Sequence, residues 1–210
     1  MPKLYFRYGV MNASKTADLL MTAHNFNAKG KAVLVLKSAV DTRSPLIQSR
    51  TGMSRHPDVV VHENTNLISF LSSSLDGPMR VKAIFVDEVQ FLTPPQIDQL
   101  REISCRVNVF CYGLRTDFRC TLFPASSRLL EVADSIKELR ACCEFCDRKA
   151  VVNAKFLNDT VVRDGAETID IGGEEKYKSM CWQCWNISSY FPSLTLFTES
   201  FSTNHDLHSD

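Results

Sequence analysis

Residues 8–16, "YGVMNASKT", contain the residue types that bind a phosphate group. Gly9, with Lys15 and Thr16 at the end of the stretch, matches a phosphate-binding loop, in which backbone N–H groups surround the anion, the lysine reaches the outer phosphates and the hydroxyl binds magnesium. Ser14 departs from this pattern, which has a glycine there, and its Cβ costs on the order of 1 kcal/mol if the backbone needs a positive φ. The stretch therefore predicts a weakened phosphate site; the alternative is an ordinary strand-to-helix turn.

Two adjacent carboxylates, Asp87 and Glu88, end the apolar segment "IFVDE". A phosphate loop needs an acid that holds magnesium and a second acid that acts on the attacking group. We expect Asp87 to bind the metal and Glu88 to act as a general base. Acids at the end of a strand are also common on protein surfaces, so the pair gains its meaning from the upstream loop.

Two cysteine pairs, "CEFC" (Cys143, Cys146) and "CWQC" (Cys181, Cys184), have the spacing of a four-cysteine zinc site. Four thiolates leave no coordination position open for water, so the predicted zinc is structural and supports the folding of a unit with little apolar core. The alternatives are redox-active or incidental cysteines, and Cys142 could replace Cys143 as a ligand.

Strand-like and helix-like segments alternate along the first part of the chain. The pattern predicts strands over 3–8, 31–36, 59–63, 81–88 and 107–114, helices over 16–26, 64–73 and 94–104, and a long mobile loop over 38–57. Alternation of this kind predicts an α/β fold, a P-loop NTPase-type parallel sheet with helices on both faces. Such sheets bind ligands at the carboxyl ends of their strands, where both the glycine loop and the two acids fall.

Beyond residue 140 the chain changes to cysteine pairs and short β-like runs. We therefore predict a nucleotide-binding α/β domain over 1–137, a small zinc-ribbon-like, β-rich domain over 138–200, and a disordered polar tail over 201–210. With 24 basic and 24 acidic side chains the formal charge is zero, so no global field favours nucleic acid. The first residues resemble no signal peptide and no run is long enough for a membrane span, so we expect a cytoplasmic protein without a membrane partner.

Five ordered segments, "YGVMNASKT", "DTR" (41–43), "DEVQFL" (87–92), "CYGLRTDFR" (111–119) and "IGGEEKYKSMC" (171–181), resemble the type II thymidine kinases over nearly the whole chain. The resemblance implies transfer of the γ-phosphoryl group of ATP to the 5′-hydroxyl of thymidine, and of deoxyuridine, in pyrimidine salvage. It also implies magnesium as cofactor, structural zinc, feedback inhibition by thymidine triphosphate and a homotetramer.

The resemblance also assigns site residues, with Glu88 as the catalytic base and a loop from the zinc unit, around 168–177, as a lid over the nucleoside. Asp170 stands where an apolar lid residue is common. The implied ATP-binding residues are Gly9, Val10, Met11, Asn12, Ala13, Ser14, Lys15, Thr16, Asp87 and Gln90, with Thr16 and Asp87 on magnesium. The implied nucleoside-binding residues are Met11, Asp41, Arg43, Phe91, Leu114, Phe118, Phe123, Thr168, Ile169, Ile171, Gly172, Gly173 and Tyr177.

Two other functions are compatible with parts of the sequence. A phosphate loop, an acid pair and a zinc ribbon also occur in nucleic-acid-linked ATPases, but the neutral charge and the lack of a basic patch with interleaved aromatic residues argue against that class. A relative that binds nucleotide or deoxynucleoside with weakened or no catalysis is the other alternative, and Ser14 is its only support.

Overall fold

The computed structural model describes residues 1–76, 80–158, 160–165 and 177–188. The described residues form two compact units. The first unit comprises Met1–Gly9, Ala13–Arg115 and Leu122–Leu139. The second comprises Val10–Asn12, Thr116–Thr121 and the described residues from Arg140 onward. The chain therefore enters the second unit and returns to the first twice before it reaches the cysteine-containing segment.

A six-stranded sheet, in which all neighbouring strands are parallel, forms the centre of the first unit. Its strand order is β5-β2-β6-β7-β1-β8. The strands are β1 (Leu4–Tyr8), β2 (Val33–Ser38), β5 (Val59–Val61), β6 (Ala83–Asp87), β7 (Asn108–Gly113) and β8 (Ser135–Glu138). Every residue of β6 is buried, as expected for a strand covered on both faces. The predicted α/β class is confirmed.

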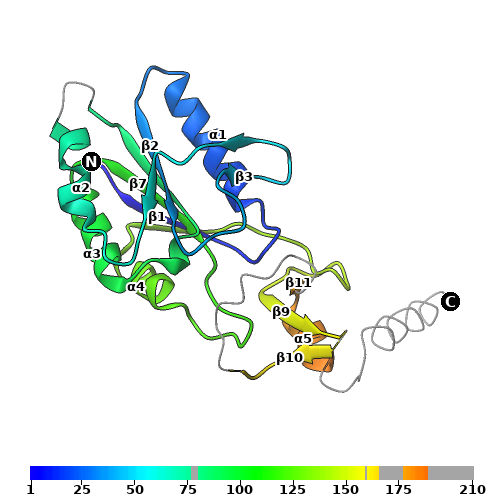
Figure 1. Cartoon of the computed structure of the whole chain (residues 1–210). Helices are drawn as coiled ribbons and strands as arrows, with labels where there is room; N and C mark the ends of the chain where they lie inside the picture. The colour runs from blue at the N-terminus through cyan, green and yellow to red at the C-terminus, as the bar shows by residue number, and fades with distance from the viewer. Residues whose placement is uncertain (77–79, 159, 166–176, 189–210) are drawn as a thin grey trace. The chain divides into compact units, whose positions relative to one another are not determined.

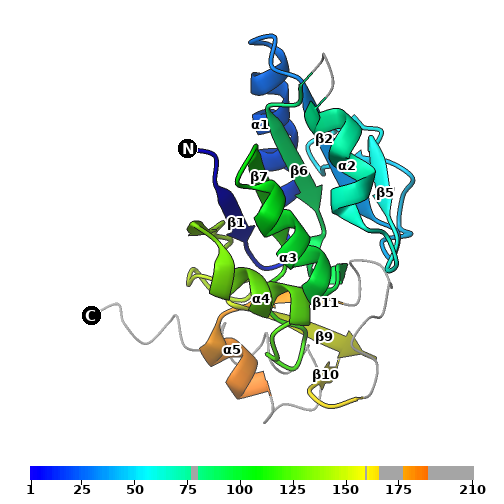
Figure 2. The same cartoon turned by 90° about the vertical axis from the view of Figure 1, so that its left-hand side faces the viewer.

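Helices cover both faces of this sheet, as predicted (Figure 1). Helix α1 lies on one face, and α2, α3 and α4 lie on the other, which faces the viewer in Figure 2. The helices are α1 (Lys15–Asn27), α2 (Leu67–Asp76), α3 (Pro94–Ile103) and α4 (Pro124–Val132). Leu19, Leu20 and Ala23 of α1 are buried at helical spacing, which is why that segment forms an amphipathic helix.

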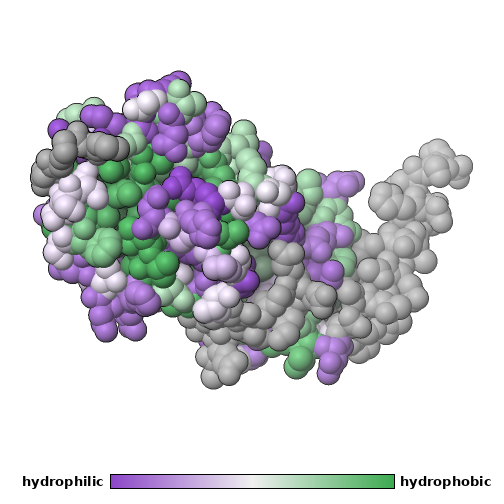
Figure 3. Space-filling model, turned by 45° about the horizontal axis from the view of Figure 1, so that its top comes forward, coloured by the Kyte–Doolittle hydropathy of each residue, from purple (hydrophilic) through white to green (hydrophobic). Residues whose placement is uncertain are grey.

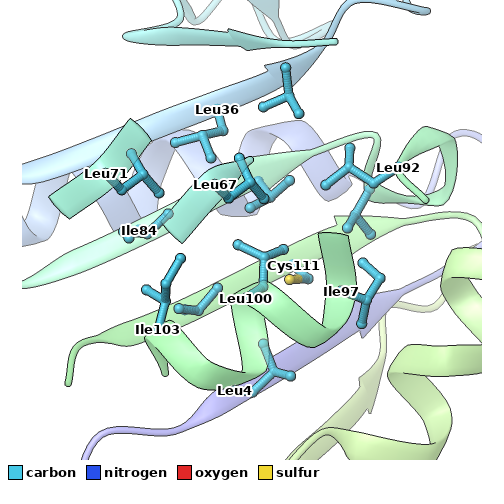
Figure 4. Close-up of a cluster of buried hydrophobic side chains, with 14 of the residues drawn as sticks. Leu4, Leu36, Leu67, Leu71, Ile84, Leu92, Ile97, Leu100, Ile103 and Cys111 are labelled. Atoms are coloured by element: carbon cyan, nitrogen blue, oxygen red, sulfur yellow. The ribbon is translucent and has the colours of Figure 1, made fainter. Parts of the chain in front are cut away.

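The larger apolar cluster lies between the sheet and helices α2 to α4 (Figure 4). Leu36 and Ile84 come from the sheet, Leu67 from α2, and Leu100 from α3, and all four are fully buried. Burial of each such side chain contributes about 1.5–3 kcal/mol. This packing holds the strands in register, so it also determines where their carboxyl ends lie. Hydrophobic side chains also reach the surface between hydrophilic ones, as Figure 3 shows for one face.

The structure corrects two expectations. The segment 38–57 is not an irregular loop throughout, because β3 (Ile47–Gln48) and β4 (Ser54–Arg55) form a short antiparallel hairpin. Ile47 is buried against the cluster beneath α1, and this apolar contact anchors the hairpin. Strand β8 was not predicted; it joins the sheet through parallel pairing with β1, a long-range contact that a short and partly exposed segment does not signal.

The second unit contains the antiparallel strands β9 (Val152–Leu157), β10 (Thr160–Val162) and β11 (Tyr177–Met180), in the order β10-β9-β11, and the short helix α5 (Trp182–Ile187). Its apolar cluster is small and includes three of the four paired cysteines among its buried residues. None of the described helices is long and apolar enough to cross a bilayer. The predicted disordered tail, 201–210, lies outside the described residues.

Hydrogen bonds of the Gln96 side chain connect the start of α3 to the segment that follows β5. Thr93 caps α3, with its hydroxyl accepting from the Gln96 N–H and its own N–H donating to Gln96 Oε1. The buried Gln96 side chain also places Nε2 2.8 Å from the carbonyl of His62, 3.2 Å from that of Glu63 and 3.1 Å from that of Thr65. One amide therefore connects a helix cap to a loop about thirty residues away in sequence.

We predict that Gln96→Leu lowers the free energy of unfolding by about 2–3 kcal/mol, because it removes the cap acceptor and leaves buried carbonyls without their donor. Urea denaturation followed by circular dichroism measures this. Gln48→Leu, at an exposed position of β3, is the matched control and should change stability by less than about 0.5 kcal/mol. Equal stability of both variants would contradict the role given to Gln96.

Candidate active site

The phosphate loop begins at Gly9, directly after β1. The Gly9 N–H donates to the carbonyl of Gly113 at 3.3 Å. A Cβ at Gly9 would lie 2.5 Å from the carbonyl oxygen of Leu139 and 2.8 Å from the Cβ of Ala13. No side chain fits these distances, so the close approach of neighbouring backbone requires glycine at this position.

Two non-glycine residues of the loop adopt left-handed backbone conformations. Asn12 has φ +66°, and Ser14 has φ 54° and ψ 27°. Ser14 immediately precedes α1, and its carbonyl accepts from the N–H of Asp18 at 3.0 Å, but its side chain makes no cap hydrogen bond. The expected cost of a Cβ at this position, about 1 kcal/mol relative to glycine, therefore applies to the conformation observed.

Lys15 and Thr16 occupy the first turn of α1, next to the two predicted acids. Lys15 is buried; this burial lowers the pKa of its ammonium group, while Glu88 and Asp87 act in the opposite direction. Thr16 Oγ1 lies 3.5 Å from Asp87 Oδ1 and 3.4 Å from Asp87 Oδ2. The structure thus brings together a cation, a hydroxyl and a carboxylate at the carboxyl end of β6. Hydroxyl and carboxylate oxygens are ligands that magnesium accepts.

The two acids differ in environment. Asp87 is the last residue of β6, and burial, together with the neighbouring charge of Glu88, raises the pKa of Asp87 to about 7, although Lys15 opposes the shift. Glu88 has φ 50° and ψ 43° and starts the turn into a short 3₁₀ helix, Val89–Phe91. A non-glycine residue in this conformation is strained, and such strain is frequent at functional sites.

Glu88 is held at both carboxylate oxygens. Arg43 Nη2 lies 2.5 Å from Oε1, and Gln90 Nε2 donates to Oε2 at 2.6 Å. Arg43 also donates through Nε to Asp41 Oδ1 at 2.7 Å, and Asp41 lies 3.4 Å from Lys37 Nζ. Burial by itself lowers the pKa of Arg43. The hydrogen bonds and negative charges of Asp41 and Glu88 outweigh this effect and raise the pKa above its usual value. Arg43 therefore places a fixed positive charge beside the predicted base.

Gln90 is buried and connects Glu88 to the residue after β7. Its Oε1 accepts from the N–H of Leu114 at 3.0 Å. A Cβ on Gly113 would lie 2.5 Å from that same Oε1, so Gly113 makes room for the Gln90 side chain. Sequence reasoning missed Gly113, and the only signal was a glycine at the end of a buried strand.

The predicted nucleoside-binding residues are distributed over both units. In the first unit, Phe91 and Phe123 lie edge to face with ring centroids 6.1 Å apart, and Leu114 follows β7. In the second unit, Phe118 is buried with the Lys155 ammonium 5.4 Å from its ring. Met11 and Tyr177 also belong to the second unit. The lid residues Thr168, Ile169, Ile171, Gly172 and Gly173, together with Asp170, lie outside the described residues.

The four predicted zinc ligands, which belong to the second unit, lie close together. The thiol sulfurs of Cys143, Cys146, Cys181 and Cys184 all lie within 4.8 Å of one another. The distance from Cys146 Sγ to Cys181 Sγ is 3.7 Å and to Cys184 Sγ 3.6 Å. Tetrahedral zinc with Zn–S bonds of about 2.3 Å requires S–S distances of about 3.8 Å. The cluster therefore has the donor type and spacing that suit zinc, and it includes Cys143, whereas Cys142 is exposed.

Comparisons with known proteins identify the family of the chain. The family described as "Thymidine kinase" matches residues 2–185. Thymidine kinase of Agrobacterium fabrum is 40% identical over 190 residues, which cover 88% of this chain and 96% of the relative. Thymidine kinase of Enterobacteria phage T4 is 39% identical over 191 residues, 89% of this chain and 96% of the relative. Thymidine kinase of Streptococcus gordonii is 37% identical over 185 residues, 86% of this chain and 94% of the relative. The match over residues 2–185 and the identity to these relatives show that the chain belongs to the thymidine kinase family.

Proposed function

We propose that this protein transfers the γ-phosphoryl group of ATP to the 5′-hydroxyl of thymidine, and also of deoxyuridine, in pyrimidine salvage. The observation that carries the proposal is the meeting of Thr16, Asp87 and Glu88 at the carboxyl end of β6, in a chain of the thymidine kinase family. The comparisons do not favour a nucleic-acid-linked ATPase, nor a relative that binds nucleotide without catalysis.

The donor set fits magnesium and a nucleotide triphosphate. Thr16 and Asp87 are the proposed magnesium ligands, and the metal, when bound, neutralises charge on the phosphates. The proposed ATP-binding residues are the loop from Gly9 to Thr16 together with Asp87 and Gln90. Lys15, buried at the start of α1, is the residue whose positive charge would neutralise the outer phosphates. Phosphoryl transfer depends mainly on such positioning and charge neutralisation.

Glu88 is the proposed base that accepts the proton of the thymidine 5′-hydroxyl. Its two oxygens already accept hydrogen bonds from Arg43 and Gln90, but a carboxylate has about four acceptor positions, so it can still accept the substrate proton. These two donors fix the orientation of the carboxylate. The second role of Arg43 is to stabilise negative charge on the phosphoryl group as it is transferred.

Aromatic and apolar side chains are the proposed walls of the thymine site. The edge-to-face pair of Phe91 and Phe123, together with Leu114, offers such a wall in the first unit. In the second unit, the proposed wall residues are Met11, Phe118 and Tyr177. Asp41 and Arg43 are the proposed polar residues of the nucleoside site. The lid residues would cover the nucleoside. Thymidine triphosphate as feedback inhibitor, a homotetramer, a cytoplasmic location and the absence of a nucleic-acid partner belong to the same proposal.

Glu88→Gln should lower kcat by about 10²- to 10⁴-fold with little change in the KM values, because the amide keeps the size of the side chain but cannot accept the proton. Transfer of labelled γ-phosphate from magnesium ATP to thymidine measures this. Glu131→Gln is the control, since Glu131 is an exposed acid of α4 that pairs with Arg128. A variant Glu88→Gln with the rate of the parent would exclude Glu88 as the base.

Ser14→Gly should lower the KM for ATP by about fivefold, because glycine adopts φ 54° without the strain of about 1 kcal/mol that a Cβ causes. Ser14→Ala separates the backbone effect from the hydroxyl, since alanine keeps the Cβ, and it should behave like the parent. If alanine improves ATP binding as much as glycine does, the serine hydroxyl and not the backbone is responsible.

Zinc in the cysteine cluster is proposed as a structural ion that stabilises the second unit. Cys146→Ser should weaken zinc binding by more than about 100-fold, since loss of a partner outside the ligand set already costs 10- to 100-fold. Mass spectrometry of the metal content and the thermal unfolding midpoint measure the effect. Cys142→Ser is the control and should keep one zinc ion per chain. Loss of zinc from Cys142→Ser, with retention in Cys143→Ser, would assign the ligand to Cys142.

A further inference from the structure

We propose that Asn153 and Ser179, two buried residues of the small sheet in the second unit, are positioning residues that fix the phosphate loop at Met11. The inference rests on the proposed function of that loop as the site that holds ATP. No motif in the sequence connects these residues with nucleotide binding. Their role follows from contacts that join positions more than 140 residues apart in the chain.

Both backbone groups of Met11 are held by these side chains. The Met11 N–H donates to Asn153 Oδ1 at 2.7 Å, and the hydroxyl of Ser179 donates to the Met11 carbonyl at 2.7 Å. Asn153 is 4% exposed and Ser179 is 1% exposed, so little water competes for either hydrogen bond. We call this pair of contacts the loop clasp.

The two residues of the loop clasp are direct cross-strand partners. Ser179 on β11 lies opposite Asn153 on β9 in the antiparallel ladder. Side chains at opposite positions of such a ladder point to the same face of the sheet. The observed register of β9 against β11 therefore places the acceptor Asn153 Oδ1 and the donor hydroxyl of Ser179 side by side, where they reach the N–H and the carbonyl of Met11. A shift of that register by one residue would turn one of the two side chains to the other face and open the clasp.

The loop clasp is also joined to the cysteine cluster. The Ser179 N–H donates to Glu144 Oε1 at 2.8 Å, and the Glu144 N–H donates to the Ser179 carbonyl at 2.9 Å. Glu144 lies within the first cysteine pair, between Cys143 and Cys146, and Ser179 precedes Cys181 by two residues. Hydrogen bonds thus connect both cysteine pairs to the backbone of Met11. This connection gives the cluster a role in ordering the phosphate loop.

The position of Met11 explains why such ordering matters. The next residue, Asn12, and the nearby Ser14 both have positive φ, so the loop has a conformation that its own residues do not favour. Without external contacts the loop would sample other conformations, and nucleotide binding would have to restore the one observed. By holding both backbone groups of Met11, the clasp lowers that ordering cost before the nucleotide arrives.

The test compares Ser179→Ala and Asn153→Ala with the matched control Ser188→Ala. Ser188 is a buried serine of the same unit whose hydroxyl donates to the Trp185 carbonyl at 2.7 Å, so its loss imposes a similar local cost without a change at Met11. In Ser179→Ala and Asn153→Ala we expect the Kd for ADP, measured by titration calorimetry with magnesium, to rise by about fivefold to twentyfold. Ser188→Ala should stay within about twofold of the parent.

Hydrogen–deuterium exchange supplies a readout that needs no turnover. Peptides that cover residues 9–16 should exchange faster in both clasp variants, while zinc content stays at the level of the parent. Ser179→Thr, which keeps the hydroxyl, should restore slow exchange. If Ser179→Ala does not fold, Asn153→Ala alone decides, because Asn153 is not bonded to the Glu144 segment by any described hydrogen bond.

Unchanged ADP affinity and unchanged exchange over residues 9–16 in a folded, zinc-containing clasp variant would overturn the inference. Thymidine phosphorylation by the parent protein is measured in parallel. A parent that binds ADP but transfers no phosphate to thymidine would contradict the proposed function and leave the loop clasp intact. The two failures are therefore distinguishable.

Discussion

Burial of the central strand β6 on both faces is the constraint on which the rest of the site depends. A parallel strand that is covered by helices must be apolar along its length. Polar residues can follow only at the carboxyl end of the strand. Asp87 lies at the carboxyl end of β6 and is itself buried. An isolated buried carboxylate is unfavourable, so the neighbouring groups have to compensate for its charge. Lys15 and Thr16 from the start of α1 do so in part, and the same groups have the chemistry that a phosphate and its metal require.

Left-handed backbone conformations occur in the predicted phosphate loop and at the predicted base. Asn12, Ser14 and Glu88 all have positive φ, and none of them is glycine. Such conformations persist only when surrounding contacts determine them. For Glu88 these contacts are Arg43 on one oxygen and Gln90 on the other, and Gly113 leaves the space that Gln90 occupies. The carboxylate of Glu88 is thus oriented by donors that come from different parts of the chain.

The second unit shows how a small core can support a precise contact. Its apolar cluster is limited, and the cysteine pairs lie within it. The four thiols have the spacing of tetrahedral zinc, and a zinc ion bound there would replace much of the stabilisation that a larger core provides. Because Glu144 and Ser179 join the two pairs, the order of the cluster extends to the strand β11 and from there to the backbone of Met11.

The elements whose signals are local could be predicted from the amino-acid sequence. These signals are apolar runs of strand length, the start of a helix at Pro94, the alternation typical of an α/β sheet and the spacing within each cysteine pair. All of them depend on residues close together in the chain, so periodicity and motif spacing were sufficient. The family, too, could be identified from ordered motifs. The contacts between distant residues became known from the fold alone: Arg43 with Glu88, Gln90 with Leu114, and Ser179 with Met11. The same holds for the addition of β8 to the sheet and for the hairpin anchored by Ile47. These contacts depend on strand register and packing between distant segments, which no local pattern specifies.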